Sequence, residues 1–271
     1  MRKPPPLKND CFALPQGANW TPVDEALGYL KLASKCLVGT EKLSAVSAAG
    51  RVLAEKVHAL YSSPPHKNSA VDGYALNSKD LKESDLISLT ILPGIAAAGH
   101  PYYGEVMLGE ALPIYTGAKM PAGTDTVILQ EDTVSENNKL TFHGPLKSGA
   151  NTRDLGEDVE KSSSILLKGR RITAGDIALM ASTGVSLITV YSKLKVGIFS
   201  TGDEIVSSGS EFAIGQVFDA NRPLLNALLD IWGFDVIDLG ILRDDRKHIE
   251  TTLEKASTEV DVIITSGGAS A

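Results

Sequence analysis

Several common features are missing from this sequence, and each absence excludes a class of protein. The 271 residues include only Cys11 and Cys36, which are too close together for a disulfide framework and lack metal-ligand spacing. No apolar run is long enough to span a bilayer, and no apolar signal core follows the basic start at residues 1–6. We therefore expect two free thiols and a cytoplasmic protein that does not contact membranes.

Motifs for several kinds of chemistry are missing as well. The five histidines are dispersed, and no Ser/His/Asp ordering suggests a nucleophilic enzyme. Neither a GxGxxG fingerprint nor a P-loop is present, so a dinucleotide-binding protein or a kinase would lack its phosphate cradle. The net charge of -7 and the scattered basic residues argue against a general nucleic-acid binder.

The C-terminal part of the sequence alternates apolar runs with helical patterns. Runs at 195–200, 236–241 and 262–264 predict the strands of a parallel sheet covered on both faces. One helix is expected from Asn221, as its cap, to a stop at Gly233. Its apolar stripe consists of Leu224, Leu225, Leu228, Leu229 and Trp232.

The second helix of this part has apolar positions from Ile249 to Val260, and Asp244 could cap it. Ligands of such sheets lie beyond the carboxyl ends of the strands, where Gly267 and Gly268 offer bare backbone N–H groups to an anion. The sequence stops three residues later, so we expect a truncated doubly wound α/β domain.

The N-terminal part predicts short elements. Thr21 and Asp24 suggest a capped helix with a buried stripe at Val23, Ala26, Leu27 and Leu30. A second short helix is expected at 47–53, followed by a strand at 57–60.

Apolar runs between Gly and Pro turns follow, and they predict a small barrel or sandwich inserted into the chain. The predicted strands lie at 87–91, 105–108 and 126–129. After the insertion we expect a strand at 165–167, a helix at 174–182 and a strand at 187–190. The expected domains are a discontinuous helical and strand linker domain (1–60 with 147–190), the inserted β-domain (61–146) and the truncated α/β domain (191–271).

Acidic residues that lie in loops beside glycines are the candidates for chemistry: Asp72, Glu157, Asp158, Asp203, Glu204, Asp219, Asp244 and Asp245. Taken singly, each is more often a solvated acid or a helix cap. Two like charges about 4 Å apart repel by roughly 1 kcal/mol in water and about 4 kcal/mol at an effective dielectric near 20. A cluster of these acids therefore implies a divalent cation such as Mg²⁺, especially when a substrate brings phosphates.

A series of short motifs makes a resemblance specific. They are residues 69–75 (SAVDGYA), 116–118 (TGA), 153–158 (RDLGED), 199–204 (FSTGDE), 218–222 (FDANR) and 266–270 (SGGAS). In this order the chain resembles the MoeA-type molybdopterin molybdenumtransferases, whose animal counterpart is the E domain of gephyrin. The resemblance runs from about Thr21 to the last residue. Val71 departs from it, because the family usually has Met there.

The resemblance implies an elongated multidomain fold of α/β and β parts, with a C-terminal β-domain that this sequence lacks. It implies Mg²⁺-dependent insertion of molybdate into adenylylated molybdopterin with release of AMP. It also implies a homodimer, with molybdopterin adenylyltransferase as a possible further partner.

Roles for individual residues follow from the same resemblance. Asp72, Glu157 and Asp219 would be catalytic, and Glu157 and Asp219 would also bind the metal. The substrate would be bound by Thr116, Gly202, Asp203, Asp244, Gly267, Gly268 and Ser270. The active site would lie between subunits, with Asp72, Thr116 and Glu157 facing the partner's sheet domain.

Two alternatives stay open at this point. The sequence lacks the basic residues and the Gly-Asn-Pro loop that the family has beyond the Gly-Gly turn. This favours a non-catalytic molybdopterin-binding or dimerising scaffold. A sugar- or nucleotide-binding α/β protein is the third interpretation.

Overall fold

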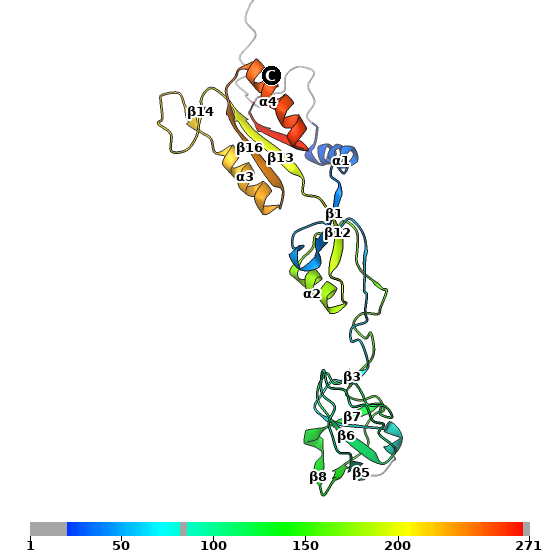
Figure 1. Cartoon of the computed structure of the whole chain (residues 1–271). Coiled ribbons are helices and arrows are strands. Elements are labelled where there is room, and N and C mark those ends of the chain that lie inside the picture. Colours follow the sequence, from blue (N-terminus) through cyan, green and yellow to red (C-terminus); the bar gives the residue numbers. More distant parts are fainter. Residues whose placement is uncertain (1–20, 82–85, 268–271) are drawn as a thin grey trace, which may run out of the picture. The chain divides into compact units, whose positions relative to one another are not determined.

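The computed structural model describes residues 21–81 and 86–267 (Figure 1). The chain divides into two compact units, one ending at Val38 and one beginning at Gly39. The first unit contains α1 (Val23–Ala33).

The elements of the second unit up to residue 142 are β1 (Thr40–Ser44), η1 (Ala45–Ser47), β2 (Val57–His58), β3 (Asn68–Ser69), β4 (Gly73–Leu76), η2 (Ser78–Asp80), β5 (Ile87–Ile91), β6 (Glu110–Ile114), β7 (Thr126–Leu129), η3 (Gln130–Asp132), β8 (Val134–Glu136) and β9 (Lys139–Phe142). Those after it are β10 (Thr152–Arg153), β11 (Ser164–Leu166), α2 (Ala174–Ser182), β12 (Leu187–Tyr191), β13 (Lys195–Thr201), β14 (Ile205–Val206), β15 (Val217–Phe218), α3 (Asn221–Ile231), β16 (Asp235–Leu242), α4 (Arg246–Glu259) and β17 (Val262–Ser266).

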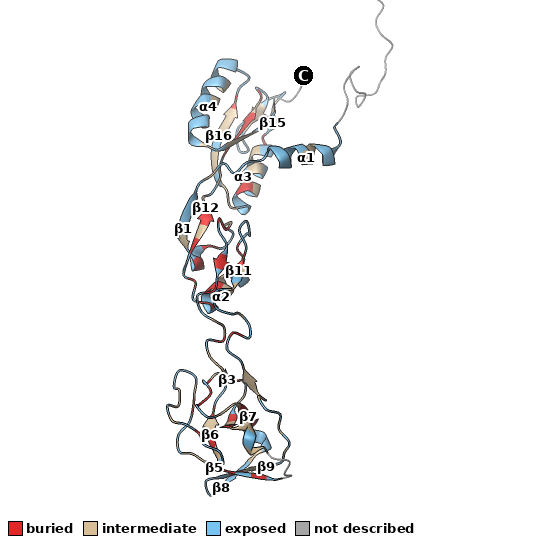
Figure 2. Cartoon of the chain, turned by 90° about the vertical axis from the view of Figure 1, so that its right-hand side faces the viewer, coloured by how far each residue is buried: buried red, intermediate tan, exposed pale blue. Residues whose placement is uncertain are grey.

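Helix α1 forms where a helix was predicted, but the predicted cap is absent and the predicted apolar stripe is not buried. Pro22 precedes the first helical residue, and no side chain caps the helix. The predicted stripe is solvent-exposed, with Val23 at 74%, Leu27 at 46% and Leu30 at 63%. Figure 2 shows the helix without a buried residue. The periodicity was correct, but among the described residues of this unit no second element can cover the apolar face.

The first core of the second unit joins sequence-distant segments. β1 pairs antiparallel with β12, and β2 pairs with β11. Helix α2 spans the predicted residues, and Thr173 and Asp176 form a reciprocal capping box at its start. The helix predicted at 47–53 is wrong. The 3₁₀ turn η1 ends at Ser47, where the helix was predicted to begin, and Leu53 forms an isolated bridge with Val190.

The inserted segment forms a six-stranded mixed sheet in the order β7-β4-β6-β5-β9-β8. Only the β5–β6 pair is parallel. The strands predicted at 87–91 and 126–129 are β5 and β7. The strand predicted at 105–108 is wrong: Val106 is buried, but Met107 and Leu108 are 58% and 60% exposed, and the chain turns before entering β6.

Strand β4 was not predicted, because residues 68–75 read as irregular. It lies between β6 and β7, and its first residue must be glycine. A Cβ on Gly73 would lie 1.8 Å from the carbonyl oxygen of Ile128. The close approach of these two backbones fixes β4 directly after Asp72.

The predicted parallel sheet of the C-terminal part is confirmed, with the order β16-β13-β17. Figure 1 shows α3 and α4 on opposite sides of it. The central strand β13 is buried from Val196 to Ser200. The stripe on α3 is buried only in part, because Leu229 is 4% exposed whereas Leu224 is 57% exposed. Gly233 ends the helix as predicted, with φ +82°.

The two helix caps predicted for this part are wrong. Asn221 is already helical, and the carboxylate of Asp219 accepts the backbone N–H of Arg222 instead. At the start of α4 the cap is Asp245, which accepts the N–H of His248 at 2.6 Å, and not Asp244. The carboxylate that accepts a backbone N–H at the start of the helix therefore lies two positions before the expected residue in α3 and one position after it in α4.

Two expectations from composition can be compared with the described residues. Cys36 is an exposed free thiol, and Cys11 lies outside the described part. None of the described helices is long and apolar enough to cross a membrane.

Candidate functional site

The first predicted pair, Asp72 and Thr116, is in direct contact. Asp72 precedes β4, and Thr116 lies in the turn that follows β6. The Asp72 Oδ1 accepts the Thr116 backbone N–H at 2.7 Å and its hydroxyl at 2.8 Å. These bonds, the backbone one first, lower the pKa of the exposed Asp72 carboxyl. Within the described part of the chain, Asp72 Oδ2 accepts no hydrogen bond, and the residue is exposed.

Glu157 lies in the turn after β10, next to an arginine. Its Oε1 accepts from Arg153 Nε at 3.0 Å, and its Oε2 accepts the Asp154 backbone N–H at 3.0 Å. The Arg153 bond, more than the Asp154 bond, lowers the pKa of Glu157. Arg153 also pairs with Asp158, so one guanidinium serves two exposed carboxylates.

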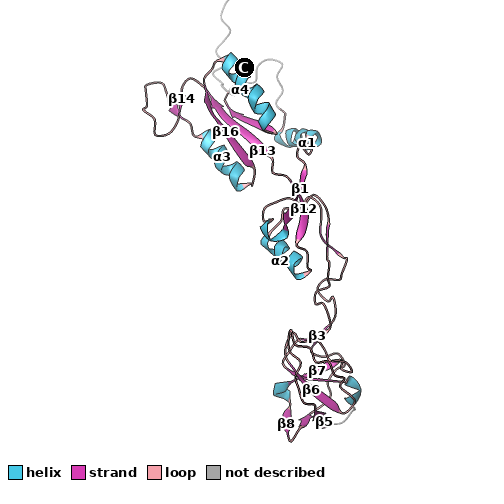
Figure 3. Cartoon of the chain, in the orientation of Figure 1, coloured by secondary structure: helices cyan, strands magenta, loops and turns pink. Residues whose placement is uncertain are grey.

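The short strand β3 contacts both the segment that carries Glu157 and the turn that carries Thr116. Asn68 of β3 pairs with Arg153 of β10. Ser69 of β3 accepts the Gly117 N–H at 2.9 Å, which fixes the turn that carries Thr116. Asp72 and Glu157 therefore belong to one region, although no hydrogen bond joins them. Figure 3 shows loops, without helix or strand, joining the part that contains α2 to the part that contains β3.

Asp219, the third predicted catalytic acid, has a different environment. It is buried and accepts hydrogen bonds from Ser200 Oγ at 3.0 Å, Arg222 N at 3.1 Å and Arg222 Nε at 2.9 Å. Burial by itself raises the pKa of Asp219, but the backbone and side-chain bonds from Arg222 and the bond from Ser200 outweigh it, so the pKa is lowered. Arg222 also forms an ion pair with Asp238 on β16.

The predicted substrate-binding residues at the carboxyl ends of the strands also converge. Thr201 Oγ1 donates to Asp244 Oδ1 at 2.9 Å, and the Asp244 N–H reaches Asp203 Oδ1 at 3.3 Å. The Gly202 N–H donates to the Leu242 carbonyl at 3.2 Å, so it is already used within the fold.

The last predicted turn is described only at its start. Gly267 is exposed at the end of β17, and a Cβ there would lie 2.7 Å from the Thr201 carbonyl oxygen. Gly268 and Ser270 lie outside the described residues. The described residues of the predicted edge are therefore Gly202, Asp203, Asp244 and Gly267, and Thr201, which was not predicted, joins them through its bond to Asp244.

The predicted metal ligands do not fit a Mg²⁺ site as they are placed. Both oxygens of Glu157 and both oxygens of Asp219 accept hydrogen bonds, in each case one or more from an arginine. A cation would have to displace a guanidinium that already neutralises the carboxylate. Across residues 21–81 and 86–267, no group of three or more His, Cys, Asp or Glu side chains is arranged to hold a metal ion.

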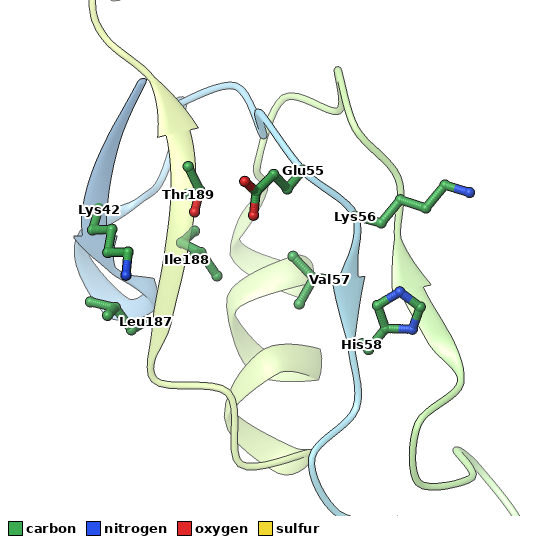
Figure 4. A pocket seen from close by; sticks show the side chains of 8 residues that line it. All are labelled: Lys42, Glu55, Lys56, Val57, His58, Leu187, Ile188 and Thr189. Atoms are coloured by element: carbon green, nitrogen blue, oxygen red, sulfur yellow. The ribbon is translucent and has the colours of Figure 1, made fainter. Parts of the chain in front are cut away.

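Two hollows border these regions. A hollow of about 600 Å³ is lined by Glu157 and Asp158 on one side and by Ile165 and Leu179 on the other. A second, of about 410 Å³, lies between β12 and residues 55–58 and contains none of the predicted site residues (Figure 4). Of these two hollows, the first is the one with a predicted catalytic side chain, Glu157, in its lining.

Sequence analysis assigned no role to the residues that hold the predicted acids. Arg153 and Arg222 each pair with a predicted catalytic carboxylate, and Ser200 donates to Asp219. The arginines lie four residues before Glu157 and three residues after Asp219, but neither pair lies within one helix, so helical spacing does not predict these contacts. No sequence pattern indicates the long-range contact from Ser200.

Comparison with known proteins covers most of the chain. Residues 21–184 match the MoeA N-terminal region (domains I and II), and residues 197–271 match a family described as a probable molybdopterin-binding domain. Among curated relatives, a molybdopterin molybdenumtransferase of Haemophilus influenzae is 40% identical, over 85% of this chain and 57% of the relative. The corresponding protein of a Nostoc species is 35% identical, over 85% and 53%.

More distant and structural relatives agree. Gephyrin of Dictyostelium discoideum is 30% identical, over 93% of this chain and 38% of its own length. A crystal structure of a molybdopterin biosynthesis MoeA protein from Pyrococcus horikoshii OT3 is 34% identical with a TM-score of 0.84, over 92% of this chain and 67% of that one. The chain spans about half the length of the curated transferases it matches.

Proposed function

The chain belongs to the MoeA family, and from this premise we propose that it takes part in molybdenum cofactor biosynthesis, in the insertion of molybdate into adenylylated molybdopterin with release of AMP. The observation that carries the proposal is the match of residues 197–271 to a molybdopterin-binding domain. In this domain the strand ends carry the cluster of Thr201, Asp203 and Asp244. That edge is where ligands of parallel sheets bind.

The side chains described above can divide the work. Strand-end backbone and hydroxyl groups would bind the phosphate of the pterin, with Gly268 and Ser270 as further predicted donors. Asp72, with one oxygen fixed by Thr116, would orient the attacking group at the phosphoanhydride. Its lowered pKa suits an ionised carboxylate that orients its partner better than a general base, which needs a pKa near the working pH.

Mg²⁺ belongs to the proposal as a companion of the ligand. When bound, it would supply positive charge to the phosphates. We place it with the phosphates rather than on Glu157 and Asp219 together, because arginines already neutralise both carboxylates. Glu157 is the easier of the two to release, since it is 46% exposed.

The proposal extends to assembly. Asp72, Thr116 and Glu157 would act on substrate held by the sheet domain of a second copy, in a cytoplasmic homodimer. Molybdopterin adenylyltransferase, which would supply the adenylylated substrate, is the further proposed partner.

Turnover tests this function. The protein is incubated with adenylylated molybdopterin, molybdate and Mg²⁺, and AMP and molybdenum cofactor are followed by chromatography. We expect both products, and a strong reduction in the Asp72→Asn variant. The control is Asp230→Asn, which removes an exposed acid from α3.

A second candidate is a non-catalytic molybdopterin-binding protein. The engagement of both oxygens of Glu157 and Asp219 with donors favours it. Binding of molybdopterin without formation of AMP or cofactor would establish this second function and refute the first.

A further inference from the structure

Strand β16 contains an irregularity in its pairing with β13. Up to Asp238 its residues pair with β13 in one register, Ile198 facing Asp238. Beyond it, Ser200 faces Ile241 and Thr201 faces Leu242. Leu239 and Gly240 therefore stand opposite the single residue Phe199. This is a β-bulge with one extra residue in β16, and it is unusual between parallel strands.

Two groups hold this bulge in place. Gly240 has φ +83°, a conformation that a residue with a Cβ rarely adopts. Its N–H donates to Asp238 Oδ1 at 2.8 Å, so the carboxylate at the start of the bulge holds the backbone of its last residue. The other oxygen of Asp238 accepts from Arg222 Nη1. The position of the bulge therefore depends on where Arg222 puts Asp238.

Arg222 is fixed at its other end. Its Nε donates to Asp219 Oδ2 at 2.9 Å, and Asp219 accepts Ser200 Oγ at 3.0 Å. Ser200 belongs to β13, the strand against which the bulge occurs. The side chains of Asp219 and Arg222 are only 2% and 15% exposed, so solvent screens the Asp219–Arg222 pair little, whereas Asp238 is 45% exposed at the other end of the connection. A continuous chain of hydrogen bonds and ion pairs thus links Ser200 on β13 to β16. Its members are Asp219, Arg222 and Asp238.

The bulge decides what lies at the carboxyl end of the sheet. A shift of one residue moves every following side chain to the opposite face of a strand. In the observed register Leu242 is buried, and Asp244 reaches Thr201. Without the extra residue, Leu242 would turn outward, and the loop with Asp244 would meet residues 201–203 one position out of place.

We propose that Arg222 is a positioning residue for the ligand edge of this sheet: by holding the bulge at Leu239 and Gly240, it sets the register in which Asp244 meets Thr201. That this edge binds molybdopterin rests on the proposed function, whereas the role of Arg222 in the bulge does not. The inference also gives Asp219 a task other than metal binding, namely to anchor Arg222.

Arginine is required because two carboxylates must be bound in different directions. The planar guanidinium uses Nε for Asp219 and Nη1 for Asp238. A lysine ammonium is a single point charge and can serve only one of them at this geometry. Arg222→Lys should therefore keep Asp219 neutralised but release the bulge.

The test uses Asp238→Asn and Arg222→Lys, both of which leave the buried Asp219 with a cationic partner. The controls are Ile198→Val, which weakens the fully buried core of the same sheet, and Arg246→Met, which removes an arginine that is 92% exposed. Hydrogen exchange of the amides at 239–245 and the Kd for molybdopterin are measured on each full-length variant, with its thermal midpoint.

We expect exchange at 239–245 to rise by about tenfold or more in the two test variants, as in a local opening. The Kd for molybdopterin should rise by a similar factor, and both quantities should stay unchanged in Ile198→Val and Arg246→Met. Unchanged exchange in the test variants overturns the inference, as does faster exchange with an unchanged Kd. If the wild-type protein binds no molybdopterin, the proposed function fails, and the exchange data still decide the role of Arg222 in the bulge.

Discussion

Two acid–arginine pairs in this molecule invite comparison, because both involve a predicted catalytic carboxylate. Asp219 pairs with Arg222 three residues later, and Glu157 pairs with Arg153 four residues earlier. The first pair is 2% and 15% exposed in its side chains, whereas the second is 46% and 38% exposed. Similar spacing in sequence has therefore produced one pair inside the fold and one at its surface.

The difference in exposure separates a charge needed to keep the fold stable from one that is free to contact a ligand. A buried carboxylate that loses its partner stays desolvated and uncompensated, so the Asp219 pair must remain intact. An exposed pair gains little from its contact because water and salt screen it. Glu157 can therefore exchange Arg153 for a ligand at little loss, whereas Asp219 cannot exchange Arg222. Of the two, Glu157 is the better candidate for direct contact with substrate.

The largest effect expected from this comparison is on the buried pair. Arg222→Met should lower the free energy of unfolding by about 3–5 kcal/mol, because it leaves Asp219 unpaired. Denaturant unfolding followed by circular dichroism measures this loss. The double variant Asp219→Asn with Arg222→Met should recover part of it. A loss below about 1 kcal/mol in the single variant would mean that the pair behaves as a surface pair.

The second-largest effect expected is that of low pH on the contribution of Asp219 to the free energy of unfolding. The folded pKa of Asp219 lies below its ordinary value of about 3.9, so its contribution to stability is present above that value. This contribution is lost as the pH falls through the folded pKa. The unfolding free energy of the wild type should thus drop more steeply below about pH 4 than that of Asp219→Asn. Equal slopes in the two proteins would contradict the assignment.

Much of the fold could be predicted because it depends on local patterns. Helix α2 lies on the predicted residues, and the strand β13 was visible as an apolar run. The errors come from long-range effects. Leu53 leaves a helix-like sequence to bridge Val190, and Gly73 begins a strand because the backbone of Ile128 passes beside it. No local pattern contains such partners.

The site shows the same division. The motifs contain Asp72, Thr116 and Asp203, and the resemblance added Asp244. None of these contacts was predicted, but the structure joins Asp72 to Thr116 and Asp203 to Asp244 by hydrogen bonds. The motifs did not distinguish a buried acid from an exposed one, since Asp219 and Glu157 both stand in loops beside glycine-rich or turn-forming sequence. Burial depends on which distant strand passes behind the loop, as β13 does behind Asp219 through Ser200.

At the exposed pair we expect a loss of activity without a loss of stability. Glu157→Gln should unfold at the same denaturant midpoint as the control Glu136→Gln, which alters an exposed acid of β8. Release of AMP from adenylylated molybdopterin should nevertheless fall in Glu157→Gln and not in the control. If the midpoint falls and AMP release does not, Glu157 is a structural residue and the comparison fails.

The smallest expected effect is that of salt. At about 1 M ionic strength the Debye length is only about 3 Å, so the exposed Arg153 should interact less with Glu157. The pKa of Glu157, followed by NMR of its side-chain carboxyl, should move back toward its ordinary value. That of Asp219 should stay lowered, because its bonds from Arg222 and Ser200 are shielded from solvent. Equal salt responses would show that the two environments do not differ.

The pairing of β3 with β10 has a mechanical consequence. Ser69 stands opposite Thr152, so the chain enters and leaves the inserted six-stranded sheet at the same place. Strands β2 and β11 form a second antiparallel pair between the two chain segments that lead to the inserted sheet. Tension applied between residues 39 and 267 would act on these strand pairs and not on the inserted sheet itself. In a pulling experiment the inserted sheet should stay folded until the β1–β12, β2–β11 and β3–β10 pairs have opened, and its unfolding should then lengthen the chain in a separate later step.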